Sequence, residues 1–390
     1  MNLVSRRRSV YVRAISKLCK MSPTCLKFFR DVFWNKQRVF VVGGHGGTAF
    51  DDNGRAVALH LAHDNGNLVY WIFKSGELAG LDHGNIRPLE RGTLKAQIAL
   101  ELCHACLYSH GWTDVTSDRH RSRSWRIDVF LSHGVYGLKR AARYIDCPPN
   151  TPFDVTICSS DWERKVRARL FGVAEHKVLP VGLPKHDTYL EAQKNGRDTI
   201  THRVVYMPTW RDWLQAKPTQ RATDNHIAGL SGLITSMPKK DSSGREFALT
   251  LVIHKNIKSS LSSFAAAFSE DRVRVVQSDE VDLQELLVSS ETLITDYSSV
   301  FWDFSLTGRK AARYIFDKEV YEWITGEYPE ASELTAPITF FDPLQIWNFL
   351  RDDNNSDLSK RMAQEWAIYS RGDACSQIEM YLLENLETFR

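Results

Sequence analysis

The stretch "LITDYSSVFWDFSLTG" (residues 293–308) decides the fold, because it begins as a buried strand and ends as an amphipathic helix. Between the two, residues 295–299 bring together small hydroxyl side chains and one carboxylate. Ser and Thr side chains accept hydrogen bonds from the free N–H groups of a first helical turn, so this segment is a candidate helix cap. The same N–H groups and the positive helix end favour phosphate, so it is equally a candidate anion site.

The alternation seen in this stretch continues through most of the chain. Apolar runs typical of buried strands alternate with helical patterns, in two sets separated by the polar stretch 187–202. The pattern predicts two successive α/β units with parallel sheets and crossover helices, whose strand carboxyl ends face a cleft. The strands are expected at residues 38–42, 68–73, 127–131, 155–158, 177–181, 204–207, 249–253, 273–276, 292–295 and 311–315.

Composition excludes several classes of protein. The chain has 390 residues, an ordinary charged fraction of 25% and a net charge of +3, which argue against disorder and against nucleic-acid binding. Seven scattered cysteines, an odd number, indicate reduced thiols in a cytoplasmic protein. The segment Cys103-His104-Ala105-Cys106 lacks a second pair at zinc spacing, so a helix with small apolar thiols is expected there.

Residues 1–36 form a basic segment in which Lys and Arg alternate with apolar side chains. It lacks the apolar core and cleavage site of a signal peptide, and no run in the chain reaches the ~18 apolar residues of a membrane span. A basic amphipathic segment can lie on an anionic membrane surface, where each cation contributes about 1 kcal/mol. An ordinary solvated helix packed on the first domain explains the pattern equally well.

The glycine-rich stretch "VFVVGGHGGTAFDDNG" (39–54) fits G-x-G-x-x-A after a strand. The acid expected at the end of the next strand is missing, because the run 68–73 is followed by Lys74. Nicotinamide binding is therefore disfavoured. At Gly46 and Gly47 the backbone either approaches another group closely or turns tightly.

A histidine follows a predicted strand in "IDVFLSHGVYGLKR" (127–140). His133 would lie at the edge where α/β proteins bind ligands, with Lys139 and Arg140 just beyond it. Histidine takes a proton near neutral pH, which typically speeds a reaction ~10²–10⁴-fold. The alternative is a capping or core histidine, but the adjoining glycine and cations favour a functional one.

Two further strands end in polar side chains that suit a phosphate. "VVYMPTWRD" (204–212) ends in Thr209 and Arg211, and "LTLVIHKN" (249–256) ends in His254 and Lys255. Arg donates bidentate hydrogen bonds to phosphate oxygens, and the Thr hydroxyl donates a hydrogen bond to them. Core packing does not explain why such groups gather at strand ends, whereas a site for the diphosphate of a nucleotide-activated donor does. The groups that compose this site are His133, Thr209, Arg211, His254, Lys255, Ser298 and Ser299.

With these motifs the chain resembles the CDP-glycerol glycerophosphotransferase family, the teichoic-acid primases and polymerases. The resemblance runs from about residue 40 to about residue 380, and "PTWRD" with "ITDYSS" is its most specific part. It implies a GT-B fold and transfer of a polyol phosphate from CDP-glycerol or CDP-ribitol to a hydroxyl of a lipid-linked or polymeric acceptor, with release of CMP. The matching motifs are "SHGVYGLKR", "SSDWERKVRARLFGV", "VGLPKHD", "YMPTWRD", "VIHKN" and "LITDYSSVFWDF".

The resemblance also implies roles for single residues. His133 would be the general base and His254 would hold the donor phosphate. Asp296 or Asp303 would support the loop or the ribose. The pyrophosphate would be bound by Thr209, Arg211, Ser298 and Ser299, and the acceptor by Gly46, Gly47, Lys139 and Arg140.

The domains implied are a membrane-associating segment (1–36), an acceptor domain (37–190), a CDP-donor domain (200–345) and C-terminal helices (346–390) that pack back on the N-terminal domain. The protein would act peripherally at the cytoplasmic face of the cell membrane. Neither a cofactor nor a metal is expected, because no carboxylate cluster calls for Mg²⁺ and cations with a helix N-terminus neutralise a diphosphate.

The sequence departs from the family pattern at several positions. Lysine follows His-Gly later than usual, at Lys139, and Lys255 replaces a common proline. Lys185 replaces an arginine, and Gln377 lies where arginine is common. Such changes are compatible with another polyol, another acceptor or a capsule-like polymer. Two alternatives stay open: a GT-B glycosyltransferase that uses a nucleotide sugar, and a non-catalytic membrane-bound nucleotide sensor.

Overall fold

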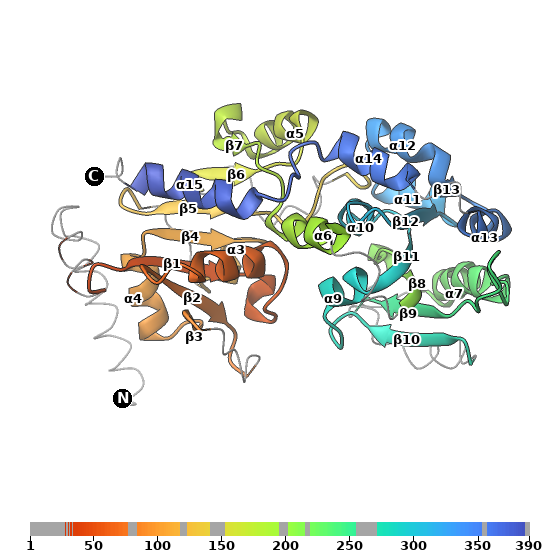
Figure 1. Cartoon of the computed structure of the whole chain (residues 1–390), viewed down its shortest axis with the longest axis horizontal. Helices are drawn as coiled ribbons and strands as arrows, with labels where there is room; N and C mark the ends of the chain where they lie inside the picture. Colours follow the sequence, from red (N-terminus) through yellow and green to blue (C-terminus); the bar gives the residue numbers. More distant parts are fainter. Residues whose placement is uncertain are drawn as a thin grey trace. The chain divides into compact units, whose positions relative to one another are not determined.

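The computed structural model describes residues 28, 30, 32, 34–76, 84–117, 123–140, 153–194, 202–214, 219–254, 271–352 and 357–386. The chain divides into two compact units, each built on its own sheet (Figure 1). Unit 1 takes residues 1–133, 145–188 and 369–390, and unit 2 takes residues 134–144 and 189–368. Most of the basic segment 1–36, and Lys255, lie outside the described residues, so the membrane association expected of that segment stays a prediction.

The sheet of unit 1 has seven strands, and every neighbouring pair is parallel. Successive strands wind outward from β1 to one edge and then, from β4 onward, to the other. This reversal between β1 and β4 is the topological switch point, where α/β proteins bind ligands beyond the strand carboxyl ends. In spatial order the strands are β3 (Ile86–Glu90), β2 (Asn67–Phe73), β1 (Arg38–Gly43), β4 (Ala105–Tyr108), β5 (Ile127–Phe130), β6 (Val155–Ile157) and β7 (Val178–Leu179).

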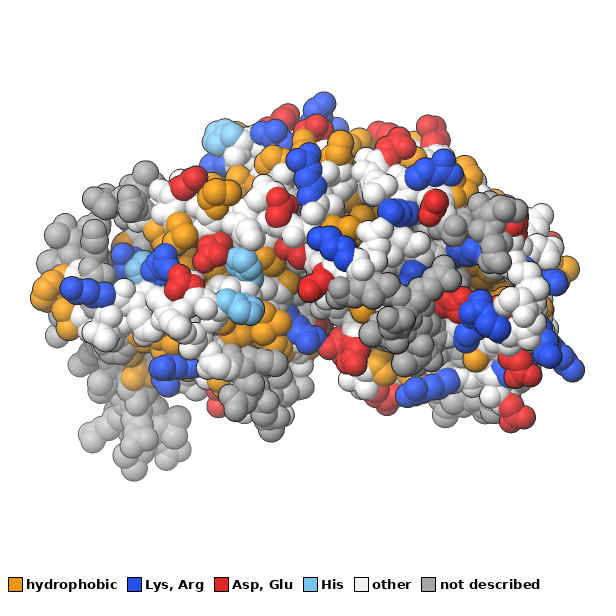
Figure 2. Space-filling model, viewed as in Figure 1, with side chains coloured by type: hydrophobic (Ala, Val, Ile, Leu, Met, Phe, Trp, Pro, Cys, Tyr) orange, Lys and Arg blue, Asp and Glu red, His pale blue; other side chains and the backbone are white. Residues whose placement is uncertain are grey.

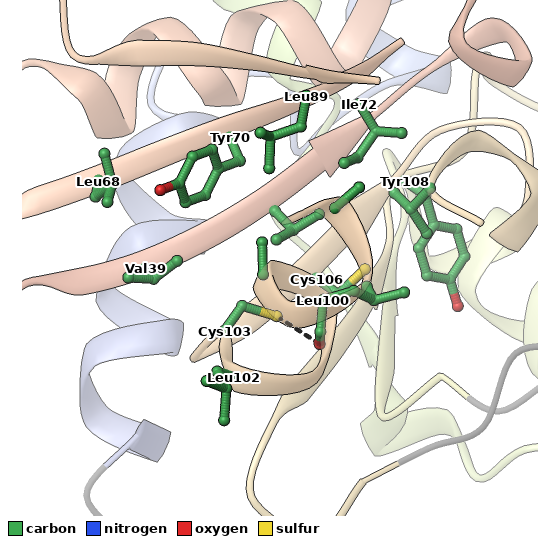
Figure 3. Packing of buried hydrophobic residues seen from close by; sticks show 14 of the residues in the cluster. Val39, Leu68, Tyr70, Ile72, Leu89, Leu100, Leu102, Cys103, Cys106 and Tyr108 are labelled. Carbon is green, nitrogen blue, oxygen red and sulfur yellow. Dashed lines mark hydrogen bonds between the residues drawn. The ribbon is translucent and has the colours of Figure 1, made fainter. Parts of the chain in front are cut away.

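Helices cover this sheet and close its core. Leu100 and Leu102 of the helix that precedes β4 lie in one apolar cluster with Val39 and Tyr70 of the sheet (Figure 3). The C-terminal helix belongs to this unit, because the Asp187 carboxylate accepts hydrogen bonds from the N–H groups that begin it. The described helices of unit 1 are α3 (Asp52–Ala62), α4 (Leu94–Leu102), α5 (Asp161–Phe171), α15 (Ala374–Leu386) and the short η1 (His45–Gly47), η2 (Trp112–Asp114) and η4 (Glu175–Lys177). Helix α6 (Pro184–Lys194) begins in unit 1 and continues into unit 2 from residue 189.

The sheet of unit 2 has six parallel strands with the same winding, and its switch point lies between β8 and β11. The two units are therefore both Rossmann-like, which confirms the predicted pair of α/β domains. In spatial order the strands are β10 (Val273–Gln277), β9 (Leu249–Ile253), β8 (His202–Tyr206), β11 (Ser290–Thr295), β12 (Lys310–Tyr314) and β13 (Thr339–Phe340).

The core of unit 2 lies between this sheet and its covering helices. Tyr206 and Ile294 of the sheet pack with Leu233 and Trp347, and the indole of Trp347 donates a hydrogen bond to the Leu233 carbonyl over 2.9 Å. The described helices are α7 (Gln220–Thr235), α9 (Leu283–Val288), α10 (Val300–Ser305), α11 (Lys318–Ile324), α12 (Pro329–Thr335), α13 (Pro343–Arg351), α14 (Leu358–Trp366) and the short η5 (Asp212–Leu214) and η7 (Ala336–Ile338).

One element was predicted wrongly. The segment around Cys103 and Cys106 is not a helix: Cys103 ends α4, and Cys106 lies in β4, hydrogen-bonded between β1 and β5. A strand enclosed by two neighbours is buried on both faces, so its apolar run shows no period that separates it from a helix. Burial raises the pKa of the Cys103 thiol to about 12, which keeps it protonated and unreactive.

Candidate functional site

At the switch point of unit 2, the segment after β8 lies beside the segment after β11. The backbone N–H of Thr209 donates to Asp296 Oδ1 over 2.8 Å, and Thr295 Oγ1 donates to the Met207 carbonyl over 2.6 Å. Two motifs nearly ninety residues apart in the chain are thereby joined at one strand edge. This is where a Rossmann-like domain binds the phosphates of a nucleotide.

Arg211 lies inside this edge and has no exposed surface. Its guanidinium donates to Asp296 Oδ2 over 2.8 Å and to Asp317 Oδ2 over 2.7 Å. The rings of Tyr297 and Tyr321 each lie 5.2 Å from it. A guanidinium enclosed by two carboxylates and two rings supports the loop after β11. The direct phosphate contact expected of Arg211 stays a prediction.

The carboxylate of Asp296 is ionised in this setting. Burial alone would raise its pKa, but the Arg211 charge and the hydrogen bonds from Thr209 lower it overall. The backbone N–H of Tyr297 donates a further hydrogen bond to the same carboxylate over 2.6 Å. Asp296 thus fixes the backbone on both sides of the candidate phosphate site.

The helix that follows begins with the two serines. Ser298 Oγ accepts a hydrogen bond from the N–H of Val300 over 3.3 Å, whereas in the described structure the Ser299 side chain makes no capping bond. Both serines are half-buried, and Asp303 is almost fully buried within the helix. Of the two serines, Ser298 therefore supplies the capping bond inferred from sequence, and the anion site stays a prediction.

His254 reaches the same edge from β9, the neighbour of β8. Its imidazole stacks on the indole of Trp210 with ring centroids 5.9 Å apart and planes 30° apart. His254 is half-buried, and Trp210 lies between Thr209 and Arg211 in the chain. The structure thus brings together the ends of β8, β9 and β11, and with them Thr209, Arg211, His254, Asp296, Ser298 and Ser299.

One residue supporting this edge was missed in the sequence. The Arg313 guanidinium, in β12, donates to the Asp296 carbonyl over 2.7 Å and to Thr335 Oγ1 over 2.6 Å, and it pairs with the Glu327 carboxylate. The signal for it was an arginine within the apolar run 311–315, since a charge buried in a central strand needs a partner. Burial raises the pKa of Glu327 despite the neighbouring Arg313 charge.

At the switch point of unit 1, the glycine-rich loop after β1 turns tightly. Gly46 and Gly47 have φ values of 62° and 81°, and a Cβ added to Gly47 would lie 2.8 Å from the Lys74 nitrogen. The Gly46 N–H donates to Asp114 Oδ1 over 2.7 Å, and Asp114 Oδ2 accepts the His110 N–H over 2.8 Å. Asp114 therefore pins the loop after β1 to the loop after β4. Contact of these glycines with an acceptor stays a prediction.

His133 follows β5 beside these loops, and its backbone is held firmly. Ser132, which precedes it, is buried with φ +58°, a conformation that costs a non-glycine residue energy. Asn53 Nδ2 donates to the Ser132 carbonyl over 2.8 Å, and Lys185 Nζ donates to the His133 carbonyl over 2.7 Å. Lys185 Nζ also pairs with Asp52 Oδ1 over 3.1 Å. Strain held by such contacts is typical of functional positions.

One imidazole lies against His133, and a third lies against that one. The His110 ring is stacked on the His133 ring, with centroids 4.9 Å apart and planes 11° apart, and the His45 ring lies 3.9 Å from His110 on a tilted plane. Sequence reasoning did not single out His45 or His110. The signal for His110 was its place after β4, a strand that was not predicted.

The two cations after His133 belong to unit 2. Arg140 donates through its backbone N–H to the Gly326 carbonyl over 2.9 Å and through Nε to the Glu327 carbonyl over 3.1 Å, so it supports the segment after α11. Lys139 is half-buried. Acceptor binding by either cation stays a prediction.

The described residues offer few signs of other chemistry. Among them, no group of three or more His, Cys, Asp or Glu side chains is arranged to hold a metal ion. No helix in the described part of the chain is long and apolar enough to cross a bilayer. On the face in Figure 2, basic and acidic side chains are interspersed without a large field of one sign.

Comparison with known proteins points to one family. A family model described as CDP-glycerol:poly(glycerophosphate) glycerophosphotransferase matches residues 26–378. A teichoic acid glycerol-phosphate primase of Bacillus spizizenii is 26% identical over 233 residues, which are 60% of this chain and 58% of that protein. The alignment thus spans less than two thirds of the length of that relative.

Two other comparisons extend over more of the chain. A teichoic acid glycerol-phosphate transferase of Staphylococcus aureus is 22% identical over 331 residues, which are 78% of this chain and 81% of that protein. A structure of the wall teichoic acid polymerase TagF, a variant soaked with CDPG, matches with a TM-score of 0.66 and 16% identity, covering 100% of this chain and 99% of that chain. At that identity the structural likeness supports the GT-B fold alone.

Proposed function

Because this chain belongs to the CDP-glycerol:poly(glycerophosphate) glycerophosphotransferase family, we propose that it transfers glycerol phosphate from CDP-glycerol to an acceptor hydroxyl and releases CMP. The observation that carries this proposal is the strand edge of unit 2, where Thr209, His254 and the start of α10 come together at the switch point. Phosphoryl transfer depends mainly on the positioning of the reactants and on neutralisation of the phosphate charge, which these groups supply.

Two histidines have separate roles in the proposed reaction. His133 takes the proton of the acceptor hydroxyl, and the oxygen attacks the phosphorus that carries glycerol. The bond from that phosphorus to the bridging oxygen breaks, and CMP leaves with the electron pair. A protonated His254, Ser299 and the first-turn N–H groups of α10 offset the charge on the phosphate oxygens. No metal and no further cofactor is needed in this scheme.

The acceptor is proposed to be membrane-linked and to belong to a teichoic-acid-like or capsular polymer. The basic segment 1–36 supports this, because its cations suit an anionic membrane surface. The enzyme would then act peripherally at the cytoplasmic face of the cell membrane. CDP-ribitol is the other donor compatible with the family.

A panel of donors tests the reaction type. The purified chain is incubated with CDP-glycerol, CDP-ribitol and nucleotide sugars, with a lipid-linked acceptor, and the nucleotide products are separated by chromatography. Release of CMP indicates attack on phosphorus and supports the proposal. Release of a nucleoside diphosphate indicates attack on a sugar carbon and establishes the glycosyltransferase alternative instead.

The variant His133→Ala tests the general base. We expect turnover to fall about 10²–10⁴-fold while the Kd for CDP-glycerol stays within twofold, since a base acts on the acceptor proton and not on the donor. Calorimetric donor titration and CMP release are measured on the same preparation. Unchanged turnover would show that His133 is not the base, and binding without any turnover in wild type would support the sensor alternative.

A further inference from the structure

The His45, His110 and His133 rings form what we name the imidazole stack, at the carboxyl ends of β1, β4 and β5. The ring of His110 lies in the middle, and it is nearly parallel to the ring of His133 at a centroid distance of 4.9 Å. The ring of His45, at the other end, is held by its Nδ1, which lies 2.9 Å from Asp51 Oδ1. A stacked partner restricts the rotation of an imidazole about its side-chain torsions.

His110 itself is held in one orientation and one tautomer. The backbone N–H of His45 donates to His110 Nδ1 over 3.2 Å, which requires that nitrogen to be unprotonated. His110 therefore carries its proton on Nε2 and is neutral in this arrangement. Its backbone N–H is fixed at the same time by Asp114 Oδ2 over 2.8 Å.

The loop that supplies the His45 N–H is rigid for separate reasons. His45 has φ +47°, and Asp114 Oδ1 accepts the N–H of the next residue, Gly46, over 2.7 Å. An added Cβ on Gly43 would lie 2.7 Å from the Asp114 carbonyl oxygen, so the two loops touch through backbone. The stack is thus anchored by the backbone of two loops and not by its rings alone.

We propose that His110 is a positioning residue that holds the His133 ring in the plane from which it takes the acceptor proton. This inference rests on the proposed function, because it assigns His133 the role of base. The backbone contacts from Asn53 and Lys185 fix the position of the His133 backbone after β5. The stacked His110 ring fixes the orientation of the His133 imidazole. Misplacing a reacting group by about 1 Å can cost 10²-fold in rate.

Two substitutions separate the ring of His110 from its hydrogen bond. His110→Asn keeps an acceptor near the His45 N–H but removes the ring, whereas His110→Phe keeps a ring but removes the acceptor. We expect kcat to fall at least about tenfold in His110→Asn and less than about threefold in His110→Phe, with KM for CDP-glycerol unchanged in both. His176→Asn, an exposed histidine in η4, is the matched control and leaves kcat unchanged.

A second measurement does not depend on turnover. Diethyl pyrocarbonate modifies accessible imidazoles, and mass spectrometry follows the rate at His133 in each variant. We expect this modification rate to rise at least about threefold in His110→Asn and to stay near wild type in His110→Phe. Only His110→Asn removes the ring that is stacked on the His133 imidazole and restricts its rotation. Thermal unfolding midpoints of all variants are recorded to identify any loss of fold.

The results of these two experiments distinguish a positioning role of His110 from its absence. A fall in kcat and faster His133 modification, both confined to His110→Asn, support the positioning role. Equal effects of the two variants, or a larger effect of His110→Phe, overturn it. If wild type fails to release CMP from CDP-glycerol, the proposed function fails instead, and the modification rates still decide whether His110 restrains His133.

Discussion

Arg211 carries a permanent charge at a place that excludes water, because its guanidinium contacts Asp296 and Asp317 while no part of the residue is exposed. A buried ion pair is stable only when each charge keeps its partners, since removing one leaves the other unpaired in a medium of low polarity. The residue therefore holds the loop after β11 in place.

The variant Arg211→Gln tests this at the residue scale. We expect the free energy of unfolding to fall by about 3–5 kcal/mol, because two carboxylates lose their buried cation. Arg245→Gln is the control, since the Arg245 side chain is 56% exposed and each of its pairs, with Asp241 and with Glu291, is expected to contribute at most about 1 kcal/mol. Urea unfolding gives both values. A variant of unchanged stability that binds CDP-glycerol more weakly would instead show that Arg211 contacts the donor.

The segment after β5 and the start of α10 constrain one another at the element scale. Gly134 lies so close to Ser299 that an added Cβ would be 2.3 Å from its Oγ and 2.9 Å from its Cβ. Such distances leave no room for a methyl group unless α10 moves. The glycine after the histidine is thus required by the approach of an element distant in the chain, and not by an unusual backbone angle.

We expect Gly134→Ala to lower the free energy of unfolding by about 1–3 kcal/mol and to reduce turnover, because the new methyl group displaces the start of α10. The double variant Gly134→Ala/Ser299→Gly removes the obstructing side chain and should recover most of the lost stability. Thermal unfolding of the two variants and of Ser299→Gly gives the comparison. Equal stability of Gly134→Ala and wild type would show that this packing is looser than described.

The whole molecule is built from two Rossmann-like units whose chain segments are interleaved. The last helix, α15, returns to unit 1, where Asp187 holds its first turn and the His60 ring pairs with Glu379 over 2.9 Å. Helices α13 and α14, just before it, belong to unit 2. The stability of unit 1 therefore depends on residues at the far end of the chain.

Deleting residues 369–390 should destabilise unit 1 selectively. Removing α15 exposes the apolar surface that Ile378 and Leu382 cover, both of which are buried. We expect a lower unfolding temperature and faster proteolysis within residues 37–188, while CDP-glycerol still binds through unit 2. Mass spectrometry of the proteolytic fragments and calorimetric titration give the two readings. Loss of CDP-glycerol binding while unit 1 stays folded would contradict the expectation that α15 stabilises unit 1 and that the donor binds through unit 2.

The pattern of apolar and polar residues along the chain predicted much of the fold. The alternation of apolar runs with helical periods predicted both α/β units, because that period depends only on neighbouring residues. Strands β3, β4 and β13 escaped prediction. β4 (Ala105–Tyr108) is short and buried on both faces, and β3 carries exposed polar residues around Pro88. The polar groups after β5, β8, β9 and β11 were proposed as site residues because each directly follows a recognisable strand.

By itself, the sequence determined that two parallel sheets form and that polar side chains follow their strands. Only the tertiary structure decided which of those side chains meet: it stacked His110 on His133, enclosed Arg211 between Asp296 and Asp317, and set Gly134 against Ser299. The physical reason is the order of strands in each sheet, which brings β1 beside β4 and β8 beside β11. That order arises from the packing of segments far apart in the chain, and a periodicity read along neighbouring residues does not contain it.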